Sequence, residues 1–445
     1  MGIIQTFKQA WKIPEMRRKL LFTLMILIIF RLGSNVPVPG INRAMLKAMF
    51  DASNAGIFGL FDLFSGGAFG NFTIFALGIS PYITASIILQ LLTVAFPALE
   101  ELSKQGEEGR KKMERITRYI TLGLAALQGF GYTFGLFKDY LTYNDVLSKI
   151  VIVMILVAGA CLTMWLGEKI NDKGVGNGIS MLIFAGIVSR IPTGITNTFK
   201  GLKEAGWAFL ATKTVAEDGT VTRTIGVLTV LLFVLFALAV IVGIIIITEG
   251  TRKVPVQYAK RVVGRKMYGG QSTHIPLKVN QAGVIPIIFA SSMLQVPATI
   301  AYMVPNSGYA KFIDKYFSVN GTPGFWIYFV FEIILIIAFT YFYGTISVNP
   351  PEIAENLKNN GGFIPGIRPG KETAKYLVKI CGKLTIVSAI FLALVAAMPT
   401  LLQHCTALAI GFGGTSLIIA VGCSLDTERA VETQLQMRNY SGFLK

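Results

Sequence analysis

Ten apolar segments alternate with polar stretches along the chain, and each has about the length of a membrane-spanning helix. A helix of about 20 apolar residues crosses the roughly 30 Å hydrocarbon core of a bilayer. The pattern therefore predicts ten transmembrane helices. They cover residues 20–36, 72–96, 116–137, 150–168, 179–197, 226–248, 284–304, 325–347, 380–402 and 407–425.

Glycine and proline interrupt several of these segments. Gly78 and Pro81 lie in the second segment, Pro192 in the fifth, and Pro286 and Pro297 in the seventh. Breaks of this kind are tolerated where a helix lines a cavity, because water or neighbouring helices can satisfy the freed backbone groups. The breaks therefore predict that the second, fifth and seventh helices line an internal cavity.

The composition agrees with a membrane protein. Hydrophobic residues make up 53% of the 445 residues and charged residues only 15%. A soluble chain normally carries about 25% charged residues. The alternative of a large soluble α protein with buried helices is therefore disfavoured, and the fold class is predicted to be an all-α polytopic membrane protein.

Lys and Arg set the predicted orientation. They concentrate at the N-terminus, at the C-terminus and in the gaps after the second, fourth, sixth and eighth helices. Positive residues are enriched on the cytoplasmic side of membrane proteins. Both termini and the large basic loops are therefore expected in the cytoplasm.

The loop 248–283 after the sixth helix is strongly basic. The alternation in KVPVQYA and the Gly-Gly that follows predict a short β-ribbon. One interpretation is that this loop merely enforces the membrane topology or attracts anionic lipid. Its length and clustered Arg instead favour docking on ribosomal RNA or an acidic protein face. The cations that would dock are Arg252, Lys253, Lys260, Arg261, Arg265 and Lys266.

The loop 347–379 after the eighth helix presents a second cation. Pro365, Gly366, Pro369 and Gly370 predict a rigid turn with Arg368 at its tip. An Arg held on a rigid turn is suited to bidentate docking on carboxylate or phosphate.

Motifs for catalysis, nucleotide binding or metal binding are not found. The sequence has no H-E-x-x-H, no G-x-S-x-G and no zinc spacing, and its four Cys residues are scattered. The predicted spans are poor in ionisable groups, Glu332 being the clearest exception. Ion-coupled transporters need such groups near the midplane, so a secondary transporter for a small solute remains the weaker alternative. No enzyme activity, cofactor or metal is expected.

One segment fits none of these patterns. GIFGLFDLFSGGAF, residues 56–69, is too apolar for an ordinary loop, yet too short and too interrupted by Gly and Asp62 to span a bilayer.

Five long motifs resemble the SecY family, the central subunits of bacterial protein-translocation channels. The motifs are FALGISPYITASIILQLL (75–92), MWLGEKINDKGVGNGIS (164–180), QSTHIPLKVNQAGVIPIIFASS (271–292), GIRPGKETAKY (366–376) and FGGTSLIIAV (412–421). The resemblance covers essentially the whole chain, with ten spans in matching order.

The resemblance implies a clamshell fold of two pseudo-symmetric five-helix halves. The N-terminal half is expected at 20–200 and the C-terminal half at 201–425, with a cytoplasmic amphipathic segment at 1–19 and a cytoplasmic tail at 426–445.

The resemblance further implies an aliphatic ring that seals the pore at mid-depth. A narrow apolar constriction resists ion leakage because it dewets. Spacing alone leaves ordinary helix packing open as the alternative. The matching positions are Ile79, Ile83, Ile179, Ile183, Ile288 and Ile419.

For residues 56–69 the resemblance implies a short re-entrant helix that plugs the external funnel, with a plain interfacial helix as the alternative. The apolar members would pack beneath the ring, Asp62 and Ser65 would face the aqueous funnel, and Gly66-Gly67 would act as a hinge. The apolar members are Ile57, Phe58, Leu60, Phe61, Leu63 and Phe64.

A lateral gate is implied between the second and third helices on one side and the seventh and eighth on the other. Ser86, Gln90, Gln128 and Ser292 are polar groups on three of these helices. Interhelical hydrogen bonds in membranes contribute only about 0.6 kcal/mol on average, so such a seam is closed yet openable. Each of the four can equally be a static packing residue.

The partners that the resemblance implies supply the energy and the substrate. They are the SecA motor ATPase, the ribosome, the small subunits SecE and SecG, signal sequences, nascent polypeptides and membrane lipids. Arg368 matches the position most associated with the motor, and the location implied is the bacterial plasma membrane.

Overall fold

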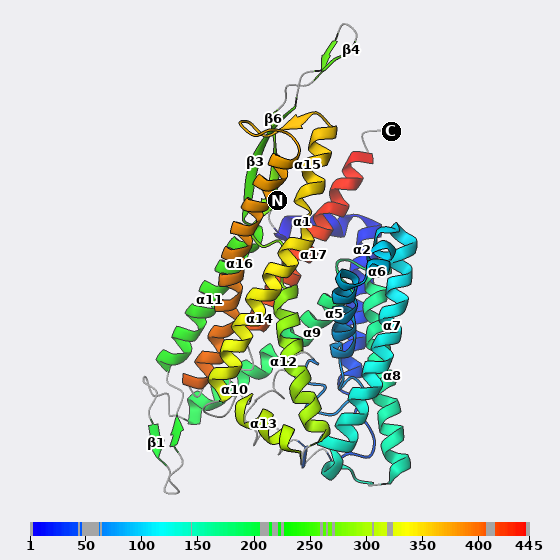
Figure 1. The fold of residues 1–445 in the computed structure, drawn as a ribbon. Helices are drawn as coiled ribbons and strands as arrows, with labels where there is room; N and C mark the ends of the chain where they lie inside the picture. Colours follow the sequence, from blue (N-terminus) through cyan, green and yellow to red (C-terminus); the bar gives the residue numbers. More distant parts are fainter. Residues whose placement is uncertain are drawn as a thin grey trace.

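Long helices form most of the molecule, and both termini lie toward the same end (Figure 1). The computed structural model describes residues 3–42, 45–46, 62, 65–143, 145–204, 213–215, 221–223, 227–258, 261–263, 266–268, 272–304, 307–317, 324–405 and 414–441.

A helix lies at each of the ten predicted spans. The N-terminal half contributes α1 (Ile3–Lys12), α2 (Pro14–Gly33), α5 (Ser80–Ala95), α6 (Pro97–Lys104), α7 (Gly106–Gly131), α8 (Val146–Lys173), α9 (Gly178–Val188) and α10 (Ile191–Glu204). The C-terminal half contributes α11 (Val227–Glu249), α12 (Ile285–Met303), α13 (Gly308–Tyr316), α14 (Gly324–Ser347), α15 (Pro350–Asn359), α16 (Lys371–Cys405) and α17 (Gly414–Ser441). In Figure 1, α7 and α8 lie on one side of the molecule and α11, α14 and α16 on the other, while α9 and α10 of the N-terminal half extend toward the second group in this view.

Two predicted spans differ from the helices that form. The second span begins eight residues late, because residues 72–79 make turns and the helix starts at Ser80 with Pro81 in its first turn. The fifth span is divided at Ser189 and Arg190 into α9 and α10. The last helix, by contrast, continues beyond its predicted end at residue 425 to Ser441 without a break.

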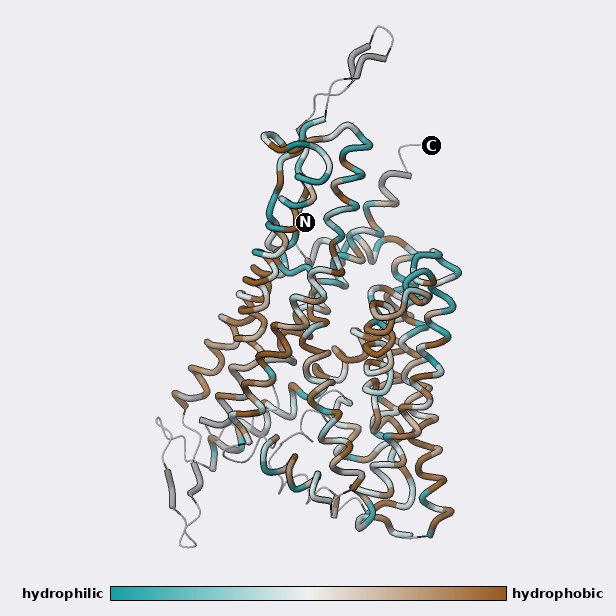
Figure 2. The backbone as a smooth tube through the Cα atoms, in the orientation of Figure 1, coloured by the Kyte–Doolittle hydropathy of each residue, from teal (hydrophilic) through white to brown (hydrophobic). Residues whose placement is uncertain are grey.

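The hydropathy of the helices fits a bilayer environment. Apolar residues occupy the middle of the molecule and polar residues its two ends (Figure 2). In the described part of the chain, five helices are long and apolar enough to span a membrane, and α5 with α6, bent by 105°, makes a sixth candidate. The shorter apolar helix α12 accounts for one further predicted span.

Short irregular helices and strands complete the molecule. A π-helix, η1 (Tyr132–Leu136), follows α7 and leads to a 3-10 helix, η2 (Lys138–Tyr140). The strands are β1 (Lys213–Val215), β2 (Val221–Arg223), β3 (Thr251–Tyr258), β4 (Arg261–Val263), β5 (Lys266–Tyr268), β6 (Ser272–Lys278) and β7 (Gly362–Phe363). The β-ribbon predicted after the sixth span is confirmed, since β3 pairs antiparallel with β6 from Thr251↔Lys278 to Gln257↔Ser272.

The two long basic loops form one unit. Strand β7, from the loop after the eighth span, pairs with the end of β3, so the sheet has the order β6-β3-β7. A small apolar core lies under it, built from Val254, Val256, Leu277, Leu357, Ile364, Leu377 and Cys381. The sequence predicted two separate loops, whereas the fold joins them because their apolar residues share this core.

Helix α8 packs tightly against the irregular segment that precedes α5. A Cβ atom on Gly159 would lie 1.8 Å from the carbonyl oxygen of Ile74. The close approach places residues 72–79 against α8 and sets where α5 begins. Only glycine allows this contact without a shift of the backbone.

We therefore predict that Gly159→Ala destabilises the protein. Overpacking of a well-filled core costs about 1–3 kcal/mol, so the midpoint of thermal unfolding of the purified protein should fall. Gly123→Ala on α7 is the matched control, because no atom lies within 4 Å of the added Cβ there. Equal midpoints for the two variants would contradict the close contact.

Candidate functional site: an aliphatic cluster between the two halves

Six isoleucines from both halves of the chain meet in one apolar cluster. Ile79, Ile83, Ile183, Ile288 and Ile419 are buried members, between 1% and 8% exposed, and Ile179 packs against them. They come from four helices, α5, α9, α12 and α17, and from the residue directly before α5. The structure thus brings together all six positions that the family resemblance implied.

Local hydrogen bonds place the two isoleucines of α9. The side chain of Asn177 caps this helix and accepts hydrogen bonds from the backbone N–H groups of Ile179 (3.1 Å) and Ser180 (3.4 Å). Asn171 Oδ1 accepts from Gly178 N at 2.7 Å. An Asn cap satisfies N–H groups that have no partner within the helix. These bonds fix the residue at which α9 begins after the Gly-rich loop, and they thereby fix the positions of Ile179 and Ile183 along the helix.

The C-terminal end of the segment predicted to act as a plug lies next to this cluster. Residues 56–61, 63 and 64 fall outside the described residues, and with them Ile57, Phe58, Leu60, Phe61, Leu63 and Phe64. The following residues are described, and Ala68 is fully buried in the same cluster as the isoleucines. The C-terminal end of the segment is therefore in contact with the aliphatic cluster.

The expectation that Asp62 and Ser65 face an aqueous funnel is wrong. Asp62 is 7% exposed and Ser65 is 3% exposed. The Asp62 carboxylate accepts a hydrogen bond from Gly70 N at 2.7 Å and forms an ion pair with Arg190, which follows α9. Ser65 Oγ donates to the Asp62 carbonyl and accepts from Phe69 N. Both polar groups are buried because they close the turn on itself and attach it to α9.

A second arginine holds the same turn. Arg31 Nη1, near the end of α2, donates to the Gly66 carbonyl oxygen at 2.9 Å. A Cβ on Gly66 would lie 2.7 Å from the Cα of Gly186 on α9, and the φ of Gly66 is +66°. The Gly66-Gly67 pair thus serves a left-handed turn and a close approach to α9. The hinge role of Gly66-Gly67 stays a prediction.

One hydrogen bond joins the predicted seam between the halves. Tyr343 Oη on α14 donates to Gln90 Oε1 on α5 at 2.6 Å. Helix α12 packs against α5, α7 and η1 on the same seam. Of the other predicted gate residues, Ser86, Gln128 and Ser292 are half-buried on α5, α7 and α12.

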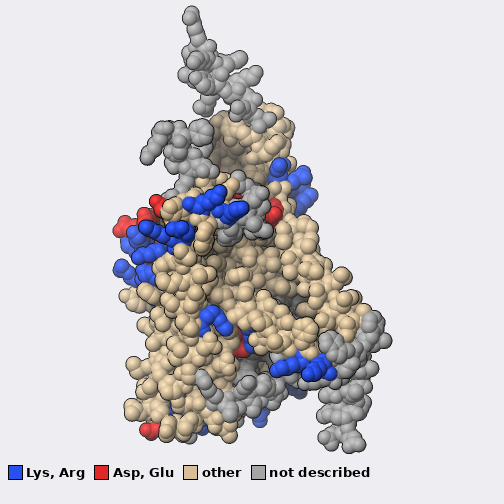
Figure 3. Space-filling view, turned by 180° about the vertical axis from the view of Figure 1, so that it is seen from behind, with Lys and Arg blue, Asp and Glu red and all other residues tan. Residues whose placement is uncertain are grey.

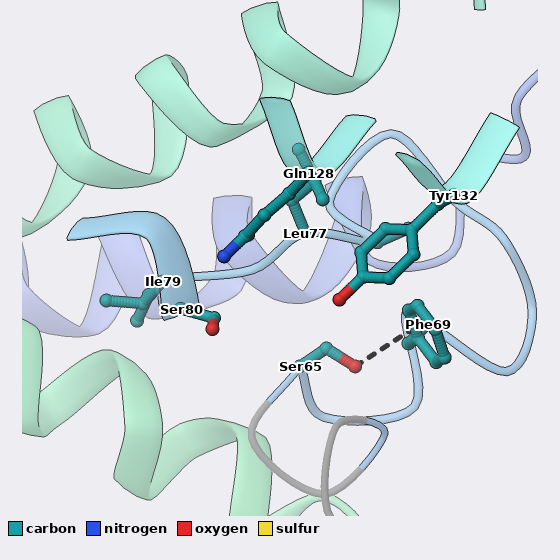
Figure 4. Close-up of a pocket in the computed structure, with 8 residues that line it drawn as sticks. Ser65, Phe69, Leu77, Ile79, Ser80, Gln128 and Tyr132 are labelled. Carbon is teal, nitrogen blue, oxygen red and sulfur yellow. Dashed lines mark hydrogen bonds between the residues drawn. The ribbon is translucent and has the colours of Figure 1, made fainter. Parts of the chain in front are cut away.

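A pocket lies where α7, η1 and the segment before α5 meet. Figure 4 shows Gln128 and Tyr132 on one side of it, and Ser65, Phe69, Leu77, Ile79 and Ser80 around it. The pocket joins one predicted gate residue, Gln128, to the turn at Ser65 and to Ile79 of the cluster. The predicted gate residue Gln128, the turn at Ser65 and Ile79 of the aliphatic cluster are therefore neighbours.

Sequence reasoning missed several residues of this region. Tyr343 and Arg190 both bond to predicted site residues, over 253 and 128 positions of sequence. On α12 the buried polar residues are Ser291, Gln295 and Thr299, not Ser292. Their spacing of four residues, which places them on one helix face, was a signal that the sequence contained.

The two basic loops present part of their cations to the outside of the molecule. Arg252, Lys253 and Arg368 are exposed. Gly366 and Gly370 have φ angles of +82° and +100°, so the predicted turn around Arg368 is confirmed. Figure 3 shows Lys and Arg gathered near one end of the molecule, above a middle region with few charges.

The remaining predicted cations are only partly described. Arg261 and Lys266 lie in the paired strands β4 and β5. Lys260 and Arg265 fall outside the described residues.

Glu332 stays without an assigned role. It is 4% exposed on α14, and its Oε2 atom has no hydrogen-bond partner among the described residues. Within the same residues no group of three or more His, Cys, Asp or Glu side chains has an arrangement that could hold a metal ion.

Comparison with known proteins agrees with this architecture. The SecY family model matches residues 73–428. The chain is 43% identical over 460 residues to the protein translocase subunit SecY of Streptomyces galbus, with full coverage of both chains.

Two solved structures share the fold. One is a SecY protein in a study of its plug domain, described as stabilising the closed state of the translocation channel (TM-score 0.63, 16% identity, 95% of this chain and 96% of that one). The other is canine Sec61 in a ribosome-channel complex (TM-score 0.61, 15% identity, 95% and 96% coverage).

The fold and the buried cluster between two helical halves define a polytopic α-helical protein-conducting channel. The full-length similarity to translocase subunits is more specific. The chain belongs to the SecY family.

We predict that Asp62→Asn loosens the turn at residues 62–70. Loss of the charge weakens a partly buried ion pair, which costs about 1–3 kcal/mol. A cysteine placed at the fully buried Ala68 should then react faster with a water-soluble maleimide than in the parent chain. Asp145→Asn, at the start of α8, is the control and should leave the rate unchanged. An unchanged rate in Asp62→Asn would show that the ion pair does not hold the turn.

Proposed function

We propose that the chain moves unfolded secretory polypeptides across the membrane and releases transmembrane segments sideways into the lipid. The observation that carries the proposal is the meeting of six isoleucines from both halves in one buried cluster. A constriction formed by side chains from both halves widens when the halves separate. Its apolar surface offers a passing backbone no hydrogen bonds and resists ion leakage when closed.

In the proposed closed state the plug and the cluster form one seal. Ala68 belongs to the cluster. Arg31 of α2 bonds to Gly66, and Arg190, between α9 and α10, pairs with Asp62, so both arginines hold the turn at residues 62–70. The solved SecY neighbour whose plug is described as maintaining a membrane seal supports this assignment. Opening then requires the turn to separate from α9.

The lateral exit is proposed to lie between α5 and α7 on one side and α12 and α14 on the other. The Gln90–Tyr343 hydrogen bond crosses this seam. Membrane hydrogen bonds of this kind average about 0.6 kcal/mol. A signal sequence that buries apolar side chains in the seam can therefore replace the contact at low cost.

The joined basic loops are the proposed docking platform for the energy source. SecA or the translating ribosome would bind there, and Arg368 is the cation on the most rigid turn. The canine Sec61 neighbour in its ribosome-channel complex supports the ribosome as a partner. The same proposal places the loops and both termini in the cytoplasm of a bacterial cell, and the chain in its plasma membrane with SecE and SecG.

A solute transporter is not favoured. The similarity to translocase subunits covers the full length of the chain, and the cluster at its centre is apolar. An ion-coupled transporter normally places ionisable groups at that depth.

We predict that a stalled secretory precursor crosslinks to a photoreactive residue at Ile83 or Ile183. Both positions would touch the polypeptide if the cluster surrounds it. Leu231 on α11, which is 61% exposed, is the lipid-facing control and should give no precursor crosslink. Crosslinks at Leu231 and none at the two isoleucines would refute the pore assignment.

We further predict that Arg368→Glu abolishes SecA-driven export into inverted vesicles while the protein remains folded and inserted. Charge reversal at an exposed docking cation replaces attraction by repulsion. Lys375→Glu is the matched control, because Lys375 is exposed nearby and pairs only with Glu372 among the described salt bridges. Normal export by Arg368→Glu would remove this residue from the docking site.

A further inference from the structure

The segment that links α8 to α9 lies directly before two of the six clustered isoleucines, Ile179 and Ile183. It covers residues 174–178, with the sequence GVGNG, and Gly176 has a φ of +78°. Glycine loses more conformational freedom on folding than any other residue. A segment with three glycines therefore needs contacts from other parts of the chain to hold it in one conformation.

A hydroxyl group from α2 holds the first part of this segment. Thr23 Oγ1 accepts a hydrogen bond from Val175 N at 3.2 Å and donates to the carbonyl oxygen of Lys19 at 3.0 Å. A Cβ atom on Gly174 would lie only 2.6 Å from Thr23 Oγ1. Thr23 is 3% exposed and Val175 is 1% exposed. The bond thus joins α2 to the segment within the protein interior.

Two other side chains hold the start of α9, but they are open to solvent. Asn171 and Asn177 accept hydrogen bonds from N–H groups of the first turn, and both residues are exposed. Water can take the place of an exposed hydrogen-bond partner. A buried N–H group that loses its partner stays unsatisfied. Thr23 is therefore the acceptor whose loss is not compensated by solvent.

The start of α9 determines where its isoleucines lie. Ile179 packs into a notch of α8, because a Cβ atom on Gly167 would lie 2.6 Å from Ile179 Cδ1. A shift of α9 by one residue would turn its side chains by about 100° and move them by about 1.5 Å along the axis. Ile179 would then leave the notch, and Ile183 would leave the cluster in which it is buried.

Helix α2 contributes none of the six isoleucines, yet it packs against them. Ile26 and Phe30 are buried members of the same apolar cluster. Thr23, Ile26 and Phe30 are three and four residues apart, so they share one face of the helix. The face of α2 that packs against the cluster therefore also carries the hydroxyl group that holds the segment 174–178.

We propose that Thr23 is a positioning residue for the apolar constriction. Its hydroxyl group holds Val175, the segment 174–178 then fixes the start of α9, and this start places Ile179 and Ile183 in the cluster. Thr23 is not itself a member of that cluster. The inference rests on the proposed function, because it concerns the residues that seal the closed channel.

The first test measures chloride leak through the resting channel in proteoliposomes without precursor. Thr23→Val removes the acceptor, and the leak should rise about tenfold, the shift that loss of one buried hydrogen bond gives to a two-state equilibrium. Thr23→Ser keeps the acceptor and should return the leak to the parent value. Thr121→Val on α7 is the matched control, because Thr121 is 1% exposed and its hydroxyl group donates to Thr117 of its own helix.

A parent-level leak in Thr23→Val would overturn the inference, and so would an equal rise in Thr121→Val. Ile183→Gly is the reference for the seal itself. If Ile183→Gly leaks and Thr23→Val does not, the inference fails and the proposed seal stands. If Ile183→Gly does not leak, the proposed seal fails, and a distance measurement decides the inference.

The distance measurement reports the position of α9 whether or not the cluster is a seal. Spin labels are attached at Val188, near the end of α9, and at Trp165 on α8, which are 37% and 49% exposed. The distance distribution should broaden in Thr23→Val and match the parent in Thr23→Ser and Thr121→Val. An unchanged distribution in Thr23→Val would overturn the inference. The native cysteines replaced by alanine for labelling are Cys161, Cys381, Cys405 and Cys423.

Discussion

The structure depends on one packing interaction, the contact of aliphatic side chains from both halves at the centre of the molecule. Ile83 and Ile183 from the N-terminal half meet Ile288 and Ile419 from the C-terminal half. No covalent bond or ion pair joins these four side chains. Apolar packing is non-directional, so such a contact suits the proposed role of sealing the closed state and reforming after a chain has passed. Stronger, directional bonds at this point would resist both steps.

Helices and irregular segments have different structural roles around this contact. Within a bilayer, backbone groups must be satisfied inside the protein, so lipid-facing segments are helical. The turns at residues 65–79 are permitted because α2, α8 and α9 pack around them. Arg31 of α2 and Thr163 of α8 donate hydrogen bonds to the carbonyl oxygens of Gly66 and Gly78. Irregular backbone thus lies inside the helical shell, next to the contact that it is proposed to seal. The same turns place Ile79 at the start of α5.

Most of the architecture was predictable from residue patterns. The ten spans follow from apolar length, and the β-ribbon follows from alternation in KVPVQYA, because both signals depend on neighbouring residues. The six isoleucines were assigned by resemblance to a family, and their spacing alone did not distinguish a ring from ordinary packing. Asp62 was placed wrongly in water. Its partner Arg190 lies 128 positions away, and no local pattern reports such a pairing.

The sequence by itself determined that this chain is a helical membrane protein, which segments form its apolar helices and which of its loops are basic. These properties depend on composition and short-range periodicity. Tertiary structure alone decided which distant segments meet: Tyr343 with Gln90, Arg190 with Asp62, strand β7 with β3, and α17 with α1. The reason is physical. Apolar helices have similar surfaces. Which helices pack together is therefore decided by their shapes and by a few buried polar groups, and these come together only in the folded chain.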